Sequence, residues 1–354
     1  MLAIDGSLGE GGGQVLRSSL ALALLTGRPF TMTNIRQRRA KPGLMPQHLK
    51  AVEAASAVGM ARVRGAQLGS QTLVFEPTGL RAGEFHFDIG TAGSISLVLQ
   101  TVLPPLSFAS ASSHMTVIGG THVAWSPSFH YLDWHWLPHM RKIGFKIRLE
   151  MEAAGFYPRG GGRVRAAVEP ANVLAPLRLL DRGRLKRIRG ISGVAGLDIA
   201  VAERQRTRAL RRLEGLSNQA EIEIQIVAFP SPSRGTFLLL LAEFENSQGC
   251  FCALGARGKP AERVADEAVD ELMDFVSTDG AIDAHLADQL ILPLALASGT
   301  SELRTSRVTQ HLLTNAEIVK MFLPVAIEIE GQAGRPGVVR IAGRGSGEAA
   351  WTTR

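Results

Sequence analysis

The hydrophobic pattern of the chain changes period several times, and the order of the changes recurs. Segments 6–27, 89–106 and 285–299 each open with small or polar residues and continue as a strongly apolar helix. Each is followed by a β-rich run, then by a second, amphipathic helix, and then by two strands predicted to form a hairpin. The pattern predicts three units of the order β-α-β-α-β-β, with about 85 residues in each of the first two. We expect each apolar helix to be buried and to point its N-terminus at a ligand.

A stretch of different character interrupts the third unit. It opens with the basic run DRGRLKRIRG and contains a very basic helix near 201–216, three candidate strands and an acidic helix. The segment PSPSRG (230–235) is predicted to be a hairpin loop. The basic helix either binds RNA or is simply solvated, and solvation is the more common role. We therefore predict an α+β fold with three parts: a large domain of residues 1–181 and 281–345 built from the three repeats, a smaller α+β domain inserted at 182–280, and a disordered tail at 346–354.

The composition is that of a mildly basic protein without membrane segments. Of 354 residues, 45% are hydrophobic, enough for one large core or two smaller ones. The formal net charge of +7 favours a polyanionic partner, although a basic enzyme without one fits equally well. Cys250 and Cys252 are one residue apart, a spacing that rarely closes a disulfide. No secretion signal is visible and no apolar run reaches about 18 residues, so we expect a cytoplasmic protein.

The segment GEGGGQ (9–14) precedes the first apolar helix. Three successive glycines let the backbone approach a ligand and leave free N–H groups at a helix N-terminus, which favours an anion. Glu10 lies in this loop, and a carboxylate at a phosphate site is suited to hold Mg²⁺ or Mn²⁺. A flexible turn with a solvated glutamate explains the segment equally well. Arg17 follows among apolar neighbours and needs a partner, either a bound phosphate or a structural carboxylate.

A basic loop, RQRRAKPGLMPQHLK (36–50), precedes the second helix of the first unit. Arg38, Arg39 and Lys41 lie close together in it, and arginine side chains bind phosphate in a bidentate manner. Because the loop should end near the glycine segment, contact with phosphate or RNA is favoured over a merely solvated loop. Gln47 opens the following helix, where it either reaches the same cleft or serves as a capping or surface residue.

Two of the apolar helices carry polar residues that need partners. Gln100 is the sole amide in SISLVLQTVL, where a hydrogen-bonded core network is a commoner explanation than a ligand. Asp288 and Gln289 occupy the predicted first turn of the third apolar helix, where an acid suits the helix dipole. Pro293 should disturb this helix soon afterwards, which favours a turn shaped for a ligand.

The loop GGTHVAWSPSF (119–129) ends the β-rich run of the second unit. Trp125 and Pro127 offer a flat apolar surface to a nucleobase. A plain loop is at least as common an explanation, so both interpretations stay open.

His311 is the histidine best placed for chemistry. The residues TNAE (314–317) predict a capping box with Thr314 as N-cap and Glu317 returning to it, which places His311 three residues before a helix N-terminus. A helix N-terminus attracts phosphate, and its dipole is expected to keep the imidazole neutral, as a base or nucleophile requires. A lone histidine in a loop is more often a surface residue. Together with the three helix starts, however, it points to a cleft that handles phosphate.

Six separated motifs resemble a known family. They are GEGGGQVLRSSLAL, RAKPGLMPQHL, GTAGSISLVLQT, GGTHVAWSP, LADQLILPLALA and QHLLTN, which cover nearly the whole chain in the order found in RNA 3′-terminal phosphate cyclases. The resemblance implies three β-α-β-α-β-β repeats, similar to the C-terminal domain of a translation initiation factor, plus a smaller inserted α+β domain. It also implies ATP-dependent conversion of an RNA 3′-phosphate end into a 2′,3′-cyclic phosphate, with RNA and ATP as partners.

The resemblance also assigns roles to residues of this sequence. It implies that His311 attacks the α-phosphorus of ATP to give AMP-histidine, that AMP passes to the RNA 3′-phosphate, and that the vicinal 2′-hydroxyl then displaces it. Glu10 matches the metal-binding position, for Mg²⁺ or Mn²⁺. The positions that match the ATP site are Arg17, Arg39 and Gln100 along the phosphates and Pro127, His285, Asp288 and Gln289 in the nucleotide pocket. We expect Arg38, Lys41 and Gln47 to contact RNA or phosphate.

Two positions depart from the family pattern. Relatives often have tyrosine in place of His285, and imidazole stacks on adenine more weakly than a phenol ring does. Relatives also tend to have an acidic residue followed by an aromatic one where this chain has His130 and Tyr131.

Two alternative functions belong to related folds. A non-catalytic ribosome-assembly branch of the family binds RNA and other partners, but it lacks the nucleophilic histidine, so His311 argues against it. A carboxyvinyl transferase acting on small anions needs no AMP-histidine and leaves the basic insert unexplained. A homodimer is compatible with the sequence.

Overall fold

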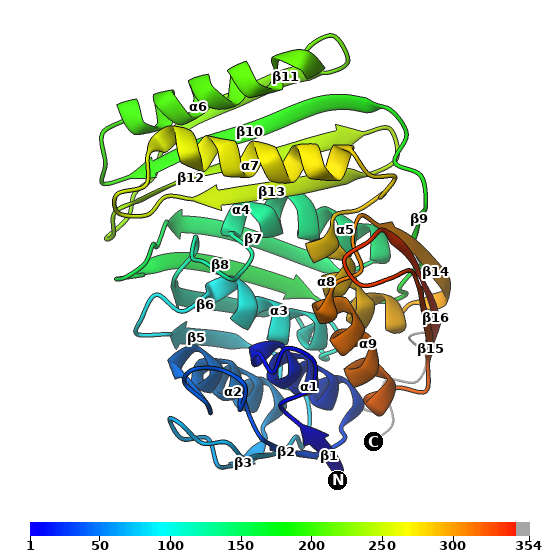
Figure 1. The fold of residues 1–354 in the computed structure, drawn as a ribbon. Helices are drawn as coiled ribbons and strands as arrows, with labels where there is room; N and C mark the ends of the chain where they lie inside the picture. Colours follow the sequence, from blue (N-terminus) through cyan, green and yellow to red (C-terminus); the bar gives the residue numbers. More distant parts are fainter. Residues whose placement is uncertain (345–354) are drawn as a thin grey trace.

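Four small mixed sheets, each with four strands, lie in the described part of the chain, residues 1–344 (Figure 1). In this computed structural model helices are combined with sheets that contain both parallel and antiparallel pairs, which confirms the predicted α+β class. The tail predicted at 346–354 lies outside the described residues. Within residues 1–344 there is no helix both long and apolar enough to cross a membrane.

Three of the sheets have the same strand order. In each, the first two strands pair in parallel and a closing hairpin adds two antiparallel strands, in the order first, second, fourth, third. These strands are β1 (Leu2–Asp5), β2 (Phe30–Thr33), β4 (Leu73–Glu76) and β3 (Arg62–Arg64); β5 (Glu84–Asp88), β6 (Ser113–Gly119), β8 (Gly162–Glu169) and β7 (Lys146–Ala153); and β9 (Arg178–Leu179), β14 (Ser298–Thr305), β16 (Gly337–Arg344) and β15 (Ala326–Glu330). Parallel pairing places the carboxyl ends of the first two strands at one edge of each sheet.

One apolar helix comes before the second strand of each unit and is largely buried. These helices are α1 (Gly13–Thr26), α3 (Ile95–Leu106) and α8 (Ala284–Ala295). Their leucines join one extended core that runs through all three units. In the first two units the helix follows directly from the first strand, so its N-terminus lies at the carboxyl edge of that sheet. α1 ends on Gly27, whose positive φ of 66° suits glycine.

A second helix follows the second strand of each unit. In the first and third units it is α2 (Pro46–Gly59) and α9 (Gln310–Phe322). In the second unit it has three parts, which are α4 (Phe129–Tyr131), the π-helical turn η1 (Leu132–Trp136) and α5 (Leu137–Ile143). α1 packs against α2, α3 and α9, and α9 also packs against α8, so the helices of different units meet.

The fourth sheet and two helices lie between β9 and α8. The strand order is β11-β10-β12-β13, and the elements are β10 (Leu185–Ala195), α6 (Ala200–Leu213), the short 3-10 turn η2 (Glu214–Leu216), β11 (Glu221–Ala228), β12 (Gly235–Phe244), β13 (Gln248–Leu254) and α7 (Ala261–Val276). The sequence pattern missed β10, because its first half carries the Lys and Arg side chains of the basic run. Since β11 and β12 flank β10 on opposite sides, the predicted hairpin loop at 230–235 is instead a crossover past β10.

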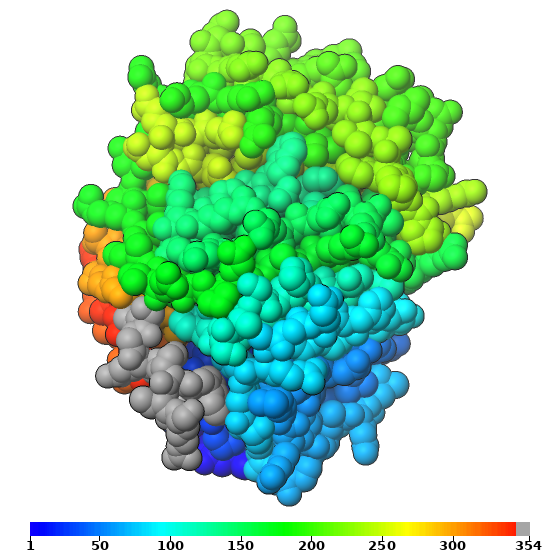
Figure 2. Space-filling view, turned by 180° about the vertical axis from the view of Figure 1, so that it is seen from behind, coloured from blue at the N-terminus to red at the C-terminus, as the bar shows by residue number. Residues whose placement is uncertain are grey.

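The sheet of the insert is buried on both faces. In β12, Phe237 and Leu239 join the core of the second unit, whereas Leu238 and Leu240 pack with α6 and α7. This explains why GTFLLLLAEF is apolar at nearly every position. Figure 2 shows the insert, coloured green to yellow, seated directly on the rest of the molecule.

The arginines of the basic helix α6 face the acidic helix α7. The ion pairs are Arg204–Glu262 at 2.7 Å, Arg208–Asp266 at 2.8 Å and Arg212–Asp270 at 2.7 Å. Much of the positive charge of α6 is therefore neutralised within the insert itself.

The structure gives a physical account of the unusual His130. Its Nδ1 lies 2.9 Å from Nε2 of His122, and both rings are buried and stacked on Phe237. Burial lowers the pKa of His130 to about 4, and it also holds the pKa of His122 well below the usual range. The two histidines therefore form a neutral hydrogen-bonded pair beneath the insert. The following residue, Tyr131, donates its hydroxyl to Asp283 Oδ1 at 3.1 Å.

Candidate active site

α9 begins earlier than the predicted capping box placed it. Thr309 is the N-cap, and its hydroxyl accepts a hydrogen bond from Leu312 N at 3.0 Å. Thr314 instead donates its hydroxyl to Gln310 O within the helix. The prediction was wrong because Thr309 offers the same capping chemistry five residues earlier. His311 therefore lies in the first turn of α9 and not in the loop before it.

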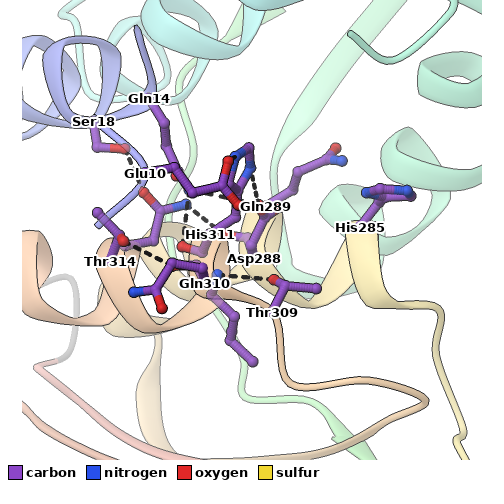
Figure 3. Close-up of polar contacts among 12 residues, drawn as sticks. Glu10, Gln14, Ser18, His285, Asp288, Gln289, Thr309, Gln310, His311 and Thr314 are labelled. Atoms are coloured by element: carbon purple, nitrogen blue, oxygen red, sulfur yellow. Dashed lines mark hydrogen bonds and ion pairs between the residues drawn. The ribbon is translucent and has the colours of Figure 1, made fainter. Parts of the chain in front are cut away.

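The imidazole of His311 lies between two carboxylates (Figure 3). Its Nδ1 is 3.4 Å from Asp288 Oδ2, and its Nε2 is 3.2 Å from Glu10 Oε2. The hydrogen bond with Asp288 raises the pKa of His311; partial burial opposes this rise, and the charge of Glu10 adds to it. This shift is opposite in direction to the one expected from the helix dipole, because the two carboxylates favour the imidazolium form.

A hydrogen-bond network around His311 connects α1, α8 and α9. Gln14 Nε2 donates to His311 O at 2.9 Å and to Asp288 Oδ2 at 3.5 Å. Ser18 donates to Asn315 Oδ1 at 2.6 Å, and Asn315 Nδ2 donates to Asp288 O at 3.0 Å. Sequence reasoning passed over these three polar residues. The available signal was the spacing of Gln14 and Ser18, which lie four residues apart and therefore share one polar stripe on an otherwise apolar helix.

The acid that caps α8 is Asp283, and not Asp288 as the pattern suggested. Asp283 Oδ1 accepts hydrogen bonds from the backbone N–H groups of His285 and Leu286 at 2.9 and 3.0 Å. Asp288 lies about one turn further along, where its carboxylate meets His311 instead of the helix terminus.

Buried polar groups hold Asp283 from the side opposite to the cap. His135 Nε2 lies 2.5 Å from Asp283 Oδ2, and Tyr131 donates its hydroxyl to Oδ1. Burial alone would raise the pKa of Asp283, but pairing with His135 outweighs it and brings the pKa to about 2. Gln248, at the start of β13, reaches His135 Nδ1 at 3.0 Å, so a residue of the insert contacts the support of α8.

Two arginines of the basic loop reach the glycine segment. Arg39 Nη2 is 3.5 Å from Glu10 Oε2, and Arg38 Nη1 donates to Gly9 O at 3.1 Å. A Cβ atom at Gly12 would lie 3.1 Å from Arg39 Nη2, so the absence of a side chain there leaves room for the guanidinium. The arginines and Glu10 thus line one end of α1.

Arg17 and His48 lie against the first residue of α1. A Cβ atom at Gly13 would come within 2.4 Å of His48 Nε2 and 2.8 Å of Arg17 Nη1, so only glycine fits. Burial lowers the pKa of Arg17 to about 10, and the charge of Asp288 opposes the fall, so Arg17 stays cationic at neutral pH. Burial and the nearby arginines lower the pKa of His48 to about 3, and its Nδ1 accepts a hydrogen bond from Met45 N.

Gln100 and Gln289 bond to each other. Gln100 Nε2 donates to Gln289 Oε1 at 2.6 Å, which joins α3 to α8. Pro293 lies inside α8, which continues to its end without the predicted disturbance near the ligand-facing turn. A proline so near the C-terminus of a helix leaves few later turns to disrupt.

The other predicted residues lie further from His311 or face solvent. Gln47 lies in the first turn of α2, with its Cβ close to Gly93. Lys41 is exposed at the end of the basic loop, and Pro127 is half-buried before α4. His285 is exposed on α8, and Figure 3 shows it set apart from His311.

Comparison with known proteins decides the family. A family model described as RNA 3′-terminal phosphate cyclase matches residues 8–329. This chain belongs to that family. A protein named RNA 3′-terminal phosphate cyclase from Hyperthermus butylicus is 44% identical over 333 residues, which cover 92% of each chain. The protein of that name from Pyrobaculum neutrophilum is 43% identical over 343 residues, which cover 97% of this chain and 98% of its own length.

A relative from Pseudomonas fluorescens has a similar sequence identity and coverage. The protein named RNA 3′-terminal phosphate cyclase from Pseudomonas fluorescens is 44% identical over 328 residues, covering 93% of this chain and 94% of its own. Among solved structures, the enolpyruvyl transferase NikO from Streptomyces tendae aligns with 99% of this chain and 50% of its own, at 12% identity and a TM-score of 0.38.

A cation at the site of this cyclase family member would need ligands beyond the protein. Within residues 1–344, no three His, Cys, Asp or Glu side chains form a group able to hold a metal ion. Mg²⁺ commonly takes one or two carboxylates and completes its coordination shell with water and phosphate oxygens. Glu10, half-exposed beside His311 Nε2, fits such a site.

Proposed function

We propose that this chain uses ATP to convert an RNA 3′-phosphate end into a 2′,3′-cyclic phosphate through AMP bound covalently to His311. The observation that carries the proposal is the seating of His311 between Asp288 and Glu10, next to the glycine-rich start of α1. Asp288 holds Nδ1, which leaves Nε2 as the atom that faces the glycine segment. Membership of the cyclase family supports the reaction.

The first step is nucleotidyl transfer to His311. The Nδ1–H group donates a hydrogen bond to Asp288, which leaves the lone pair of Nε2 free to attack the α-phosphorus. A P–N bond forms as the P–O bond between the α-phosphorus and the β-phosphate breaks, and pyrophosphate leaves. Glu10 would hold Mg²⁺ or Mn²⁺, which when bound would supply positive charge to the phosphates. When Glu10 turns to that role it no longer accepts a hydrogen bond from Nε2, so the imidazole loses its second proton more readily.

Two further steps complete the reaction. An oxygen of the RNA 3′-phosphate attacks the phosphorus of AMP, the P–N bond breaks, and a phosphoanhydride between RNA and AMP forms. The vicinal 2′-hydroxyl then attacks the terminal RNA phosphorus, loses its proton, and displaces AMP. Arg17 and Arg39 neutralise the phosphates, because Arg17 lies against Gly13 at the start of α1 and Arg39 lies beside Glu10.

The remaining predicted residues take supporting roles in this proposal. The nucleotide lies against α8, where Gln100 and Gln289 already pair across two helices. Pro127 and His285 contact the base, and Asp288 orients His311. The residues that meet the RNA terminus are Arg38, Lys41 and Gln47.

The proposal includes a domain division. Residues 1–181 with 281–345 form the catalytic domain, because their three sheets share one strand order, and 182–280 form the inserted α+β domain. We further propose that the protein acts in the cytoplasm, where its free thiols stay reduced. The homodimer stays a prediction.

A labelling experiment tests the covalent step. The protein is incubated with α-labelled ATP and Mg²⁺ or Mn²⁺, without RNA. Wild type should take up acid-labile label, and His311→Ala should lose nearly all of it because no other group forms the intermediate. His114→Ala, which changes an exposed histidine on β6, is the matched control and should label like wild type. Absence of label on wild type, or equal label on His311→Ala, would exclude this mechanism and favour the non-catalytic or carboxyvinyl transferase alternative.

A further inference from the structure

Two strongly exposed aromatic side chains lie on neighbouring loops of the second unit. Trp125 is 99% exposed and Tyr157 is 78% exposed, although aromatic side chains of this size are usually well buried. Trp125 also has a positive φ of 64°, a conformation that bulky residues rarely adopt. The loop thus holds the indole outward against the backbone preference of tryptophan.

The loops that carry these rings are firmly attached to one another. The backbone N–H groups of Thr121 and His122 both donate to Gly155 O, at 2.9 and 3.1 Å. Phe156 N donates to Ser233 Oγ at 2.8 Å, which ties the loop of Tyr157 to the crossover of the insert. The ring of Phe156 also stacks on His122 at 5.4 Å between centroids. The aromatic side chains therefore project from a fixed base.

Two cationic side chains accompany the aromatic ones. Arg159 is exposed and uses Nη1 to donate to Pro232 O at 2.8 Å, and Arg234 is exposed on the same crossover. Within residues 1–344 neither guanidinium pairs with a carboxylate, in contrast to the arginines of α6. We call the group of Trp125, Tyr157, Arg159 and Arg234 the aromatic platform.

The topology places Trp125 in the loop that carries site residues in the other two units. The loop after the second strand holds Arg38 and Arg39 in the first unit and leads directly to His311 in the third. In the second unit the corresponding loop follows β6 and holds Trp125. Ligands of α/β sheets commonly bind beyond the carboxyl ends of parallel strands, and all three loops begin there.

A series of close contacts connects the aromatic platform with the start of α1, where the arginines of the candidate site lie. Gly120 N donates to Gly93 O at 2.8 Å, which joins the Trp125 loop to the start of α3. A Cβ atom on Gly93 would lie 2.9 Å from the Cβ of Gln47, the neighbour of His48 on α2. His48 in turn lies against the first residue of α1. A strand of RNA whose 3′ end is at the arginines would extend from that end along these elements.

We propose that Trp125 and Tyr157 stack on unpaired bases of the RNA upstream of its 3′-phosphate, while Arg159 and Arg234 face the RNA backbone. This inference rests on the proposed function, which supplies RNA as the substrate. Stacking on aromatic side chains is tolerant of sequence, because every base has a π face, and arginines beside them bind phosphates. An indole that is 99% exposed offers its whole face to a ligand, as stacking with an unpaired base of a polymer requires.

The test separates RNA binding from the chemistry at His311. We compare wild type with the double variant Trp125→Ala/Tyr157→Ala in self-adenylation by ATP alone and in cyclisation of a 3′-phosphorylated, unstructured oligoribonucleotide of about ten nucleotides. We expect a KM for RNA roughly tenfold higher or more in the variant, with unchanged self-adenylation. Phenylalanine at both positions should restore most of the RNA affinity. Leu68→Ala, which removes an exposed apolar side chain of the first unit, is the control and should behave like wild type.

Fluorescence gives an independent measure of binding. RNA added to wild type should quench tryptophan emission, and Trp125→Phe should lose much of that quenching although three other tryptophans remain of the four. An unchanged KM for RNA in the double variant overturns the platform, and so does a rise confined to the KM for ATP, which would assign the rings to adenine. Wild type that takes no label overturns the proposed function instead, and the quenching assay still decides the platform because it needs no adenylation.

Discussion

His311 is a base whose two ring nitrogens both face carboxylates. Asp288 at Nδ1 and Glu10 at Nε2 stabilise the imidazolium form, which raises the pKa of His311. A nucleophile needs the opposite, a free lone pair on Nε2. The ligand-free arrangement therefore favours a proton at the atom that has to react, and Glu10 must leave Nε2 before the attack.

Replacement of Glu10 by glutamine should lower the pKa of His311, because the amide removes one of the two negative charges that favour the imidazolium. NMR titration of the imidazole, without ATP or metal, measures the shift directly. In wild type the rate of self-adenylation should rise with pH through the raised pKa, since only the deprotonated Nε2 attacks. Glu53→Gln, an exposed glutamate on α2, is the control. An unchanged titration in Glu10→Gln would show that the 3.2 Å contact does not influence His311.

At this scale the sequence singled out several of the residues that the structure gathers around His311, but not their pairings. Glu10 and His311 stood out because glycines surround one and a predicted helix start lies beside the other. The partnership of His311 with Asp288 joins residues from two helices, so no local pattern contains it. The capping chemistry of Thr309 and Asp283 was masked by the equally suitable Thr314 and Asp288 nearby.

Among the elements, α8 depends on a buried support at its N-terminus. Asp283 caps the helix with one oxygen and pairs with His135 through the other. The same helix carries Asp288, the partner of His311. Since Gln248 of β13 contacts His135, the insert helps to fix the position of a helix at the candidate site.

Asp283→Ala should lower the free energy of unfolding by about 3–5 kcal/mol, because it removes a buried carboxylate and leaves the buried His135 without its partner. Urea denaturation followed by circular dichroism measures the loss. Asp198→Ala provides a matched control, since Asp198 also bonds a backbone N–H at a helix start but is exposed. That variant should lose no more than about 1 kcal/mol. Equal losses in the two variants would contradict a special role for the buried pair.

The sequence pattern predicted well those elements whose hydrophobic residues follow one clear pattern along their whole length. α1, α3 and α8 were found because their apolar runs are long enough to be read as buried helices. β10 was missed because Lys186, Arg187 and Arg189 occupy its first half, where only Ile188 is buried, and hide a strand that is continuously buried from Gly190 onwards. The neutralisation of α6 by α7 was likewise out of reach, since it joins residues 54–58 positions apart.

At the scale of the molecule, several histidines are buried in the neutral state. Burial is the main cause that lowers the pKa of His130 to about 4 and of His48 and His139 to about 3, and it depresses the pKa of His122 as well. His122 and His130 lie where the second unit meets the insert, and His139 lies in α5. The junction between the parts of the chain is thus built on imidazoles that must stay uncharged.

Stability should therefore fall as the solution becomes acidic. An unfolded histidine titrates near pH 6.5, whereas these titrate lower in the folded protein, so the unfolded state binds more protons between about pH 6.5 and pH 4. The stabilisation is complete above that window and is lost on descending through it. Each such histidine contributes roughly 1.4 kcal/mol per pH unit while it is protonated only in the unfolded state. His311 acts in the opposite sense, and so do Asp133 and Glu271, whose pKa values are raised by burial, but these shifts are smaller than those of the four histidines.

Urea denaturation at several pH values between 7 and 5 measures this dependence. His139→Asn separates titration from packing, because asparagine can still donate a hydrogen bond to His135 O, the contact that His139 Nδ1 makes. The cavity left by the smaller side chain should destabilise His139→Asn equally at every pH. A slope of unfolding free energy against pH that is smaller than in wild type therefore isolates the proton taken up by His139. A wild-type free energy that stays level from pH 7 to pH 5 would mean that these imidazoles gain access to water or to partners before the protein unfolds.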